Sequence, residues 1–102
     1  MDGRRVDRGA AERLGRNVFM ARRRAGFSQE ALGALASLHR TEVGMVEKGE
    51  RLPRADTLIK LASALGVGAG ELLEGVDWVV SAPTRPGNFV VSPGRARGGD
   101  AA

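Results

Sequence analysis

The sequence predicts an all-α fold, a compact bundle of five helices followed by a short C-terminal extension. Two observations support this fold class. Five consecutive segments carry apolar residues at helical spacing, with loops of only a few residues between them. After Gly75 the pattern changes to two β-rich runs, residues 78–80 and 89–91, which favour a strand pair or β-hairpin. A chain of 102 residues is long enough for one small hydrophobic core.

The first predicted helix covers residues 11–25 and ends at Gly26. When the chain turns by about 100° per residue, one inner stripe is formed by Leu14, Val18, Ala21 and Ala25. Phe19 points away from this stripe. We therefore expect one narrow face of this helix to be buried.

The other four helices are shorter and have recognisable ends. Ser28 is a good N-cap for the second helix, whose expected inner face is Leu32, Leu35 and Ala36. The third helix covers residues 40–48, ends at Gly49, and should bury Val43, Val46 and Glu47. The fourth covers residues 55–65 with an inner stripe of Leu58, Leu61, Ala62 and Leu65. The fifth covers residues 69–74 and contributes Leu72 and Leu73.

The chain divides into four segments. We expect residues 1–10 to be a flexible basic arm and residues 11–75 to be the helical domain. Residues 76–93 form the extension with the possible strand pair, and residues 94–102 are expected to be a disordered tail.

Composition excludes several classes of function. The chain has no cysteine and one histidine, His39, so thiolate and histidine metal sites are not expected. No apolar run predicts a membrane span or a signal peptide, and we expect a cytoplasmic protein. No paired carboxylates, nucleophile–base couple or phosphate loop is visible, so we expect no enzyme, no catalytic residue and no cofactor.

Positive charge is concentrated at the start of the chain. Residues 1–27 hold eight arginines against three acids, a net charge of +5, whereas residues 28–75 hold five basic residues against seven acids. Fourteen of the sixteen basic residues are arginine, which suits phosphate recognition but would also follow from a GC-rich genome.

The second and third helices have the spacing of a helix-turn-helix. Gly33 is small enough to let the third helix approach the second. The shared core would consist of Leu32, Ala36, Leu38, Val43 and Val46. By itself this spacing is a moderate signal, because any helical hairpin shows something similar.

The wider sequence resembles the phage repressor and Cro family, also called the xenobiotic-response-element type, over residues 14–75. The most specific pieces are Arg22, Gly26-Phe27-Ser28-Gln29, Val46-Glu47-Lys48-Gly49, Pro53 and the run from Leu58 through Leu65-Gly66-Val67. The resemblance implies a lambda-repressor-like five-helix bundle, with residues 11–75 as a DNA-binding domain. It also implies a two-fold dimer on operator DNA, with the third helix in the major groove.

Three positions depart from the family pattern. The turn residue, usually glycine, is Ser37, which would cost about 1 kcal/mol in a left-handed conformation. The cap of the third helix, usually a small hydroxyl residue, is His39, and a core position usually held by leucine is Ala21.

Glu47 lies on the inward face of the third helix, and a buried carboxylate needs a partner. The resemblance implies that this partner is Arg22, in a structural ion pair that fixes the first helix to the third.

The outward face of the third helix carries the expected base-contacting residues, Arg40, Thr41, Glu42, Gly44 and Met45. Arginine can bind guanine through two hydrogen bonds, and methyl groups can contact thymine. The expected backbone-contacting residues are Gln29, His39, Lys48, Arg51 and Arg54. His39 has two alternative roles, as the cap of the third helix or as a contact to phosphate.

The sequence therefore predicts a DNA-binding transcriptional regulator, a repressor that acts as a homodimer on a palindromic operator. The alternative is a protein-interaction module on the same fold, such as an antitoxin or a bridging coactivator. Phe19, Trp78 and Phe89 are candidates for a protein partner, or for folding of the extension onto the bundle or onto a second copy.

Overall fold

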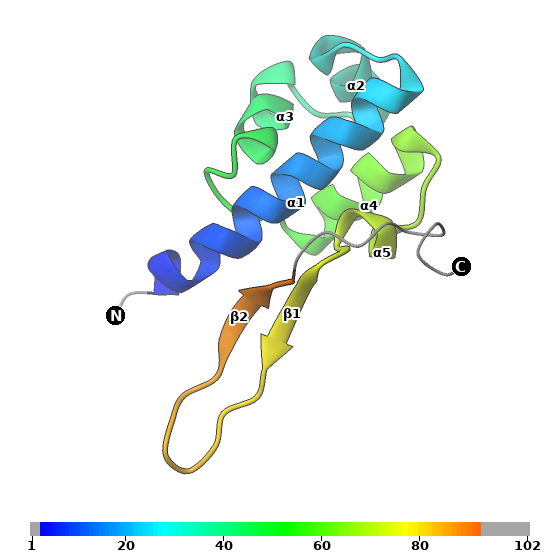
Figure 1. The fold of residues 1–102 in the computed structure, drawn as a ribbon. Coiled ribbons are helices and arrows are strands. Elements are labelled where there is room, and N and C mark those ends of the chain that lie inside the picture. The colour runs from blue at the N-terminus through cyan, green and yellow to red at the C-terminus, as the bar shows by residue number, and fades with distance from the viewer. Residues whose placement is uncertain (1–2, 93–102) are drawn as a thin grey trace, which may run out of the picture.

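A computed structural model describes residues 3–92 of the chain. Five helices precede a two-stranded antiparallel sheet, which confirms the predicted fold class (Figure 1). The elements in order are α1 (Gly3–Ala25), α2 (Gln29–Ala36), α3 (Arg40–Glu47), α4 (Ala55–Leu65), α5 (Ala69–Leu72), β1 (Val76–Val79) and β2 (Asn88–Val91).

The core lies where all five helices meet. Its largest fully buried side chains are Leu14 and Val18 of α1, Leu32 of α2, Val43 of α3, Leu61 of α4 and Leu72 of α5. Every helix thus contributes to one cluster, and α1 packs against α3, α4 and α5 (Figure 1). Burial of this apolar surface is the main force that holds such short helices in place.

The first helix is longer than the sequence predicted. It begins at Gly3 rather than near residue 11, so the expectation of a flexible arm is wrong for residues 3–10. Ala10 and Ala11 are buried, which gives the early turns of α1 tertiary contacts that a free arm would lack. The remainder of the expected arm, residues 1–2, and the expected tail, residues 94–102, lie outside the described residues.

The hairpin makes some of these tertiary contacts with the early turns of α1. β1 and β2 pair from Val76↔Val91 to Val79↔Asn88, as the β-rich runs predicted. β2 makes more of the contacts with α1 than β1 does. A Cβ on Gly9 would lie 3.8 Å from Val91 Cγ2, and Arg13 Nη1 donates a hydrogen bond of 2.9 Å to the Ser92 carbonyl. The extension therefore folds back onto the N-terminal half of α1.

Three apolar positions expected inside are exposed. Leu35 is 59% exposed on α2, and Ala25 and Leu73 are also exposed. Ala25 is the last residue of α1, beyond the core cluster. Helix α5 ends at Leu72 rather than at residue 74, so Leu73 lies in the following turn and not on a helical stripe.

Within residues 3–92, no helix combines the length and the apolar character needed to cross a lipid bilayer.

Candidate nucleic-acid interface

The α2–turn–α3 unit has well-defined local caps. Ser28 accepts a hydrogen bond of 2.9 Å from the Ala31 amide at the start of α2. His39 caps α3, because its Nδ1 accepts a hydrogen bond of 3.0 Å from the Thr41 amide. Ser37 adopts the left-handed conformation, with φ 58° and ψ 43°, so this turn carries the strain that serine incurs there.

Two glycines allow the helices to approach closely. A Cβ on Gly33 would lie 2.6 Å from the Leu38 carbonyl oxygen, so the glycine makes room for the turn and the start of α3. A Cβ on Gly15 would lie 2.7 Å from the Glu47 carbonyl oxygen and would also collide with that of Val46. Gly15 thus sets the distance between α1 and α3. The sequence analysis missed it, although a glycine inside a strong helical pattern is a recognised sign of close packing.

Behind α3, a buried ion pair connects it to α1. Arg22 Nε donates to Glu47 Oε2 at 2.6 Å, and Arg22 Nη2 donates to Glu47 Oε1 at 3.0 Å. The two side chains are only 10% and 5% exposed. Arg22 Nη1 also donates to the Phe27 carbonyl at 2.8 Å. The hydrogen bonding of Arg22 to Glu47 and the negative charge of that carboxylate raise the pKa of the guanidinium, so Arg22 stays charged.

Gln29 joins this pair from α2. Its Nε2 donates a hydrogen bond of 2.9 Å to Glu47 Oε1, so one carboxylate holds three helices together. The amide lies over Gly44, whose missing Cβ would be 3.5 Å from Gln29 Oε1. From the sequence, Gln29 was expected only to contact phosphate. Its contact with Glu47 depends on how α2 and α3 cross.

The first turn of α3 faces outward. Arg40 and Thr41 are exposed, whereas Glu42, Gly44 and Met45 are half-buried. Val43 and Val46 point into the core on the opposite side. The five residues expected to contact bases therefore fall into an open group at the N-terminal end and a more enclosed group along the helix.

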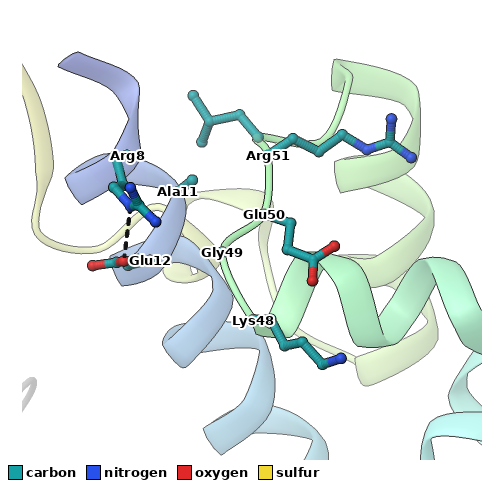
Figure 2. Close-up of a pocket in the computed structure, with 8 residues that line it drawn as sticks. Arg8, Ala11, Glu12, Lys48, Gly49, Glu50 and Arg51 are labelled. Carbon is teal, nitrogen blue, oxygen red and sulfur yellow. Dashed lines mark ion pairs between the residues drawn. The ribbon is translucent and has the colours of Figure 1, made fainter. Parts of the chain in front are cut away.

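The residues expected to contact phosphate surround this helix. His39 and Lys48 flank α3, and Arg51 and Arg54 follow in the loop and at the start of α4; all four are exposed. Arg54 forms an exposed ion pair of 3.5 Å with Asp56. Figure 2 shows Lys48 and Arg51 extending from the loop away from Arg8 and Glu12 of α1, with which they line an open cleft.

Phe19, Trp78 and Phe89, the aromatic candidates for a protein partner, do not form a single surface. Phe19 lies under two guanidinium groups, with the Cζ atoms of Arg22 and Arg23 at 5.4 and 5.6 Å from the ring centroid. Trp78 and Phe89 pack edge to face in the hairpin, with centroids 5.0 Å apart. A joint protein-binding site of Phe19, Trp78 and Phe89 is therefore not supported.

Asn17 was also missed. Its Nδ2 donates to the carbonyl oxygens of Leu72 and Glu74 at 3.0 and 2.9 Å. It thereby ties α1 to the end of α5, immediately before the hairpin.

The chain is similar to known proteins in sequence and in structure. The model of the helix-turn-helix family HTH_3 matches residues 19–72. The control protein C.SmaI of Serratia marcescens is 44% identical over 62 residues, which are 61% of this chain and 74% of that protein.

Two solved structures are similar as well. The restriction-modification controller protein C.AhdI from Aeromonas hydrophila has a TM-score of 0.63 and 35% identity, over 65% of this chain and 96% of that one. The P22 c2 repressor, solved in complex with a synthetic operator, has a TM-score of 0.58 and 26% identity, over 61% of this chain and 94% of that one.

Proposed function

Because the chain belongs to the HTH_3 helix-turn-helix family of DNA-binding transcription regulators, we propose that it is a repressor that binds a palindromic operator as a dimer through α3. The observation that carries this proposal is that one side of α3 is exposed and the other is held by buried contacts. Its first turn is open to solvent at Arg40 and Thr41, and its back is fixed by the buried contacts of Glu47. A helix held from behind can enter a major groove without losing its orientation.

The base contacts follow from the exposed turn. Arg40 is the residue with the geometry to bind guanine N7 and O6 through two hydrogen bonds. The methyl groups of Thr41 and Met45 can contact thymine, and Glu42 can accept a hydrogen bond from a cytosine amine. Gly44 has no side chain, so the middle of this face is recessed, and the Gln29 amide lies over Gly44.

The phosphate contacts come from groups around α3. Gln29 lies at the N-terminus of α2, where free amides and the helix dipole favour an anion. His39 uses Nδ1 for the cap, which leaves Nε2 for a phosphate. Lys48, Arg51 and Arg54 add positive charge on the C-terminal side. Such contacts fix register and orientation rather than sequence choice.

Two copies are needed for useful affinity. Residues 28–75, which include α2 and α3, carry more acids than bases, so this part of the domain has little general attraction for DNA. A two-fold dimer on half-sites about 34 Å apart doubles the contacts and adds their free energies. Binding of this kind represses by covering a promoter. C.SmaI is a control protein and C.AhdI a restriction-modification controller, which supports a regulatory role for this chain.

The test is a footprint of the purified protein on the DNA upstream of its gene. We expect protection of an inverted repeat, with affinity that falls steeply as salt rises. The double variant Arg40→Ala/Thr41→Ala should bind this site roughly 10- to 100-fold more weakly. The matched control is Lys60→Ala/Ser63→Ala, a basic and a small polar residue exposed on α4. Equal losses in the two double variants, or no protected repeat, would refute the proposal.

A further inference from the structure

Within residues 3–92, the outer edge of β1 has no further strand beside it. β2 makes more of the contacts with α1 than β1 does, and β1 forms the edge of the two-stranded sheet farther from that helix. Along β1, Trp78 is 53% exposed and Val80, just after it, is 70% exposed. A flat, apolar strand edge is a template for pairing with another strand. The hairpin also lies outside residues 19–72, the region that the family model matches.

Two backbone hydrogen bonds identify which groups point outward from β1. The Ser92 amide donates to the Gly75 carbonyl at 2.9 Å, so Gly75 and Ser92 form a hydrogen-bonded pair. Such pairs alternate along an antiparallel ladder. The backbone groups of Asp77 therefore face β2, and those of Val76 and Trp78 face away from it. The Val76 amide, which donates to the Leu73 carbonyl at 3.0 Å, agrees with this assignment.

We infer that β1 pairs antiparallel with β1 of a second copy, about a two-fold axis that passes by Trp78, and that this contact is a dimer interface of the regulator. The inference rests on the proposed function for the need for a second copy. In this register the amide and carbonyl of Trp78 bind those of the second copy's Trp78, and the Val80 amide donates to the second copy's Val76 carbonyl. Within residues 3–92, none of these four backbone groups takes part in another hydrogen bond.

The other two-fold registers on this edge form fewer hydrogen bonds, because their central pairs depend on the Val76 amide or the Val80 carbonyl. A register centred on Val76 needs its amide, which already donates to Leu73. A register centred on Val80 needs its carbonyl, which accepts a hydrogen bond of 2.9 Å from Arg85 Nη1. Centring on Trp78 also places Asp77 opposite the second copy's Val79, so the two Asp77 carboxylates do not face each other. In the register centred on Trp78, the Val76 amide and the Val80 carbonyl keep their bonds to Leu73 and Arg85. The bonds between copies then come from the Trp78 groups, the Val76 carbonyl and the Val80 amide.

The aromatic side chains favour the same arrangement. Trp78 and Phe89 lie on one face of the hairpin, and the ring of Trp78 packs over Gly87. Pairing about Trp78 brings the second copy's Trp78 and Phe89 onto this face, so four aromatic rings form one cluster. A two-stranded hairpin by itself is only marginally stable. A four-stranded sheet with a shared apolar face is more stable.

The position of the edge is compatible with DNA binding. The hairpin extends from the bundle near the N-terminal half of α1, and α2 lies toward the opposite end of that helix (Figure 1). Pairing through β1 therefore leaves Arg40 and Thr41 uncovered by the interface in each copy.

Trp78, the one tryptophan in the chain, reports on this contact directly. With the full chain and no DNA, we expect its fluorescence to shift to shorter wavelength as the protein concentration rises, in parallel with dimer formation in sedimentation equilibrium. Dimerisation without any change in Trp78 emission would overturn the inference. A chain that is monomeric at all concentrations, with or without operator DNA, would overturn it as well.

The variant Val80→Lys adds a charge to the open edge, and Val80 is too exposed to matter for the core. We expect it to dimerise at least about tenfold more weakly. The matched control is Val90→Lys, the same change on β2, where the backbone pairs with Asp77. If Val80→Lys dimerises as tightly as the control while Ile59→Lys, on α4, does not dimerise, the interface lies on the helices and the inference is wrong.

A cysteine tests the register, because the chain has none of its own. In the Trp78→Cys variant, facing Cα atoms about 5.5 Å apart would allow a disulfide between copies. In Val80→Cys the two positions would be about 13 Å apart and should not cross-link. Cross-linking of the second variant and not the first would refute the register.

These outcomes separate the inference from the proposed function. A Val80→Lys protein that stays dimeric and protects the operator removes the β1 interface alone. A wild-type protein that dimerises through β1 and protects no operator removes the proposed function and keeps the interface.

Discussion

Replacement of Gly15 by alanine tests the claim that one glycine sets the spacing of α1 and α3. The new Cβ would lie 2.7 Å from the Glu47 carbonyl oxygen and in collision with that of Val46. Because unstrained contacts begin near 3.5 Å, the two helices must separate by about 1 Å. Such overpacking costs about 1–3 kcal/mol, and the better helix propensity of alanine returns up to about 1 kcal/mol.

We therefore expect the free energy of unfolding to fall by about 1–2 kcal/mol, measured by urea denaturation followed by far-UV circular dichroism. The control is Gly9→Ala on the same helix, where the nearest atom would be Val91 Cγ2 at 3.8 Å, an ordinary contact. That variant should gain up to about 1 kcal/mol from helix propensity. If Gly15→Ala is as stable as Gly9→Ala, close approach of α1 and α3 does not constrain this position, and the reasoning fails.

Three further changes test other parts of the fold. Ser37→Gly should raise the free energy of unfolding by about 0.5–1 kcal/mol, since glycine removes the left-handed strain; no change in the urea midpoint would show that the strain is absent. Glu47→Ala should cost about 3 kcal/mol or more, because it leaves Arg22 buried without its partner. Adding Arg22→Met to that variant should recover stability in thermal unfolding but not operator affinity, and failure to recover would locate the cost elsewhere. Asn17→Ala should cost about 1–3 kcal/mol and speed proteolysis within residues 76–91, because it leaves the Leu72 and Glu74 carbonyls without this donor; unchanged proteolysis would argue against the tie.

Local signals in the sequence were enough for most helix boundaries. Ser28, His39 and Gly66 each end or cap a helix through their own backbone or side chain, and α4 covers residues 55–65 as predicted. The inward positions of Val43 and Val46 followed from helical periodicity alone. The pairing of Arg22 with Glu47 came from the family resemblance together with the inward position of Glu47, and the structure places the two side chains in contact.

Contacts between segments far apart in the sequence could not be predicted from these local signals. The basic start of the chain has the composition of a free arm, yet residues 3–10 continue α1, and β2 packs beside them. The contact of Gln29 with Glu47 depends on how α2 and α3 cross. Leu35 fits the inner stripe of α2, but that short helix meets the core through Leu32 and Ala36 and leaves Leu35 in solvent.

The sequence by itself determined the five helices, the hairpin and the helix-turn-helix, because caps, turns and hydrophobic periodicity act over a few neighbouring residues. Tertiary structure alone decided the length of α1, the three-helix contact at Glu47 and the open edge of β1. Each of these depends on which surfaces meet after the chain folds, and periodicity within one segment carries no information about its partner.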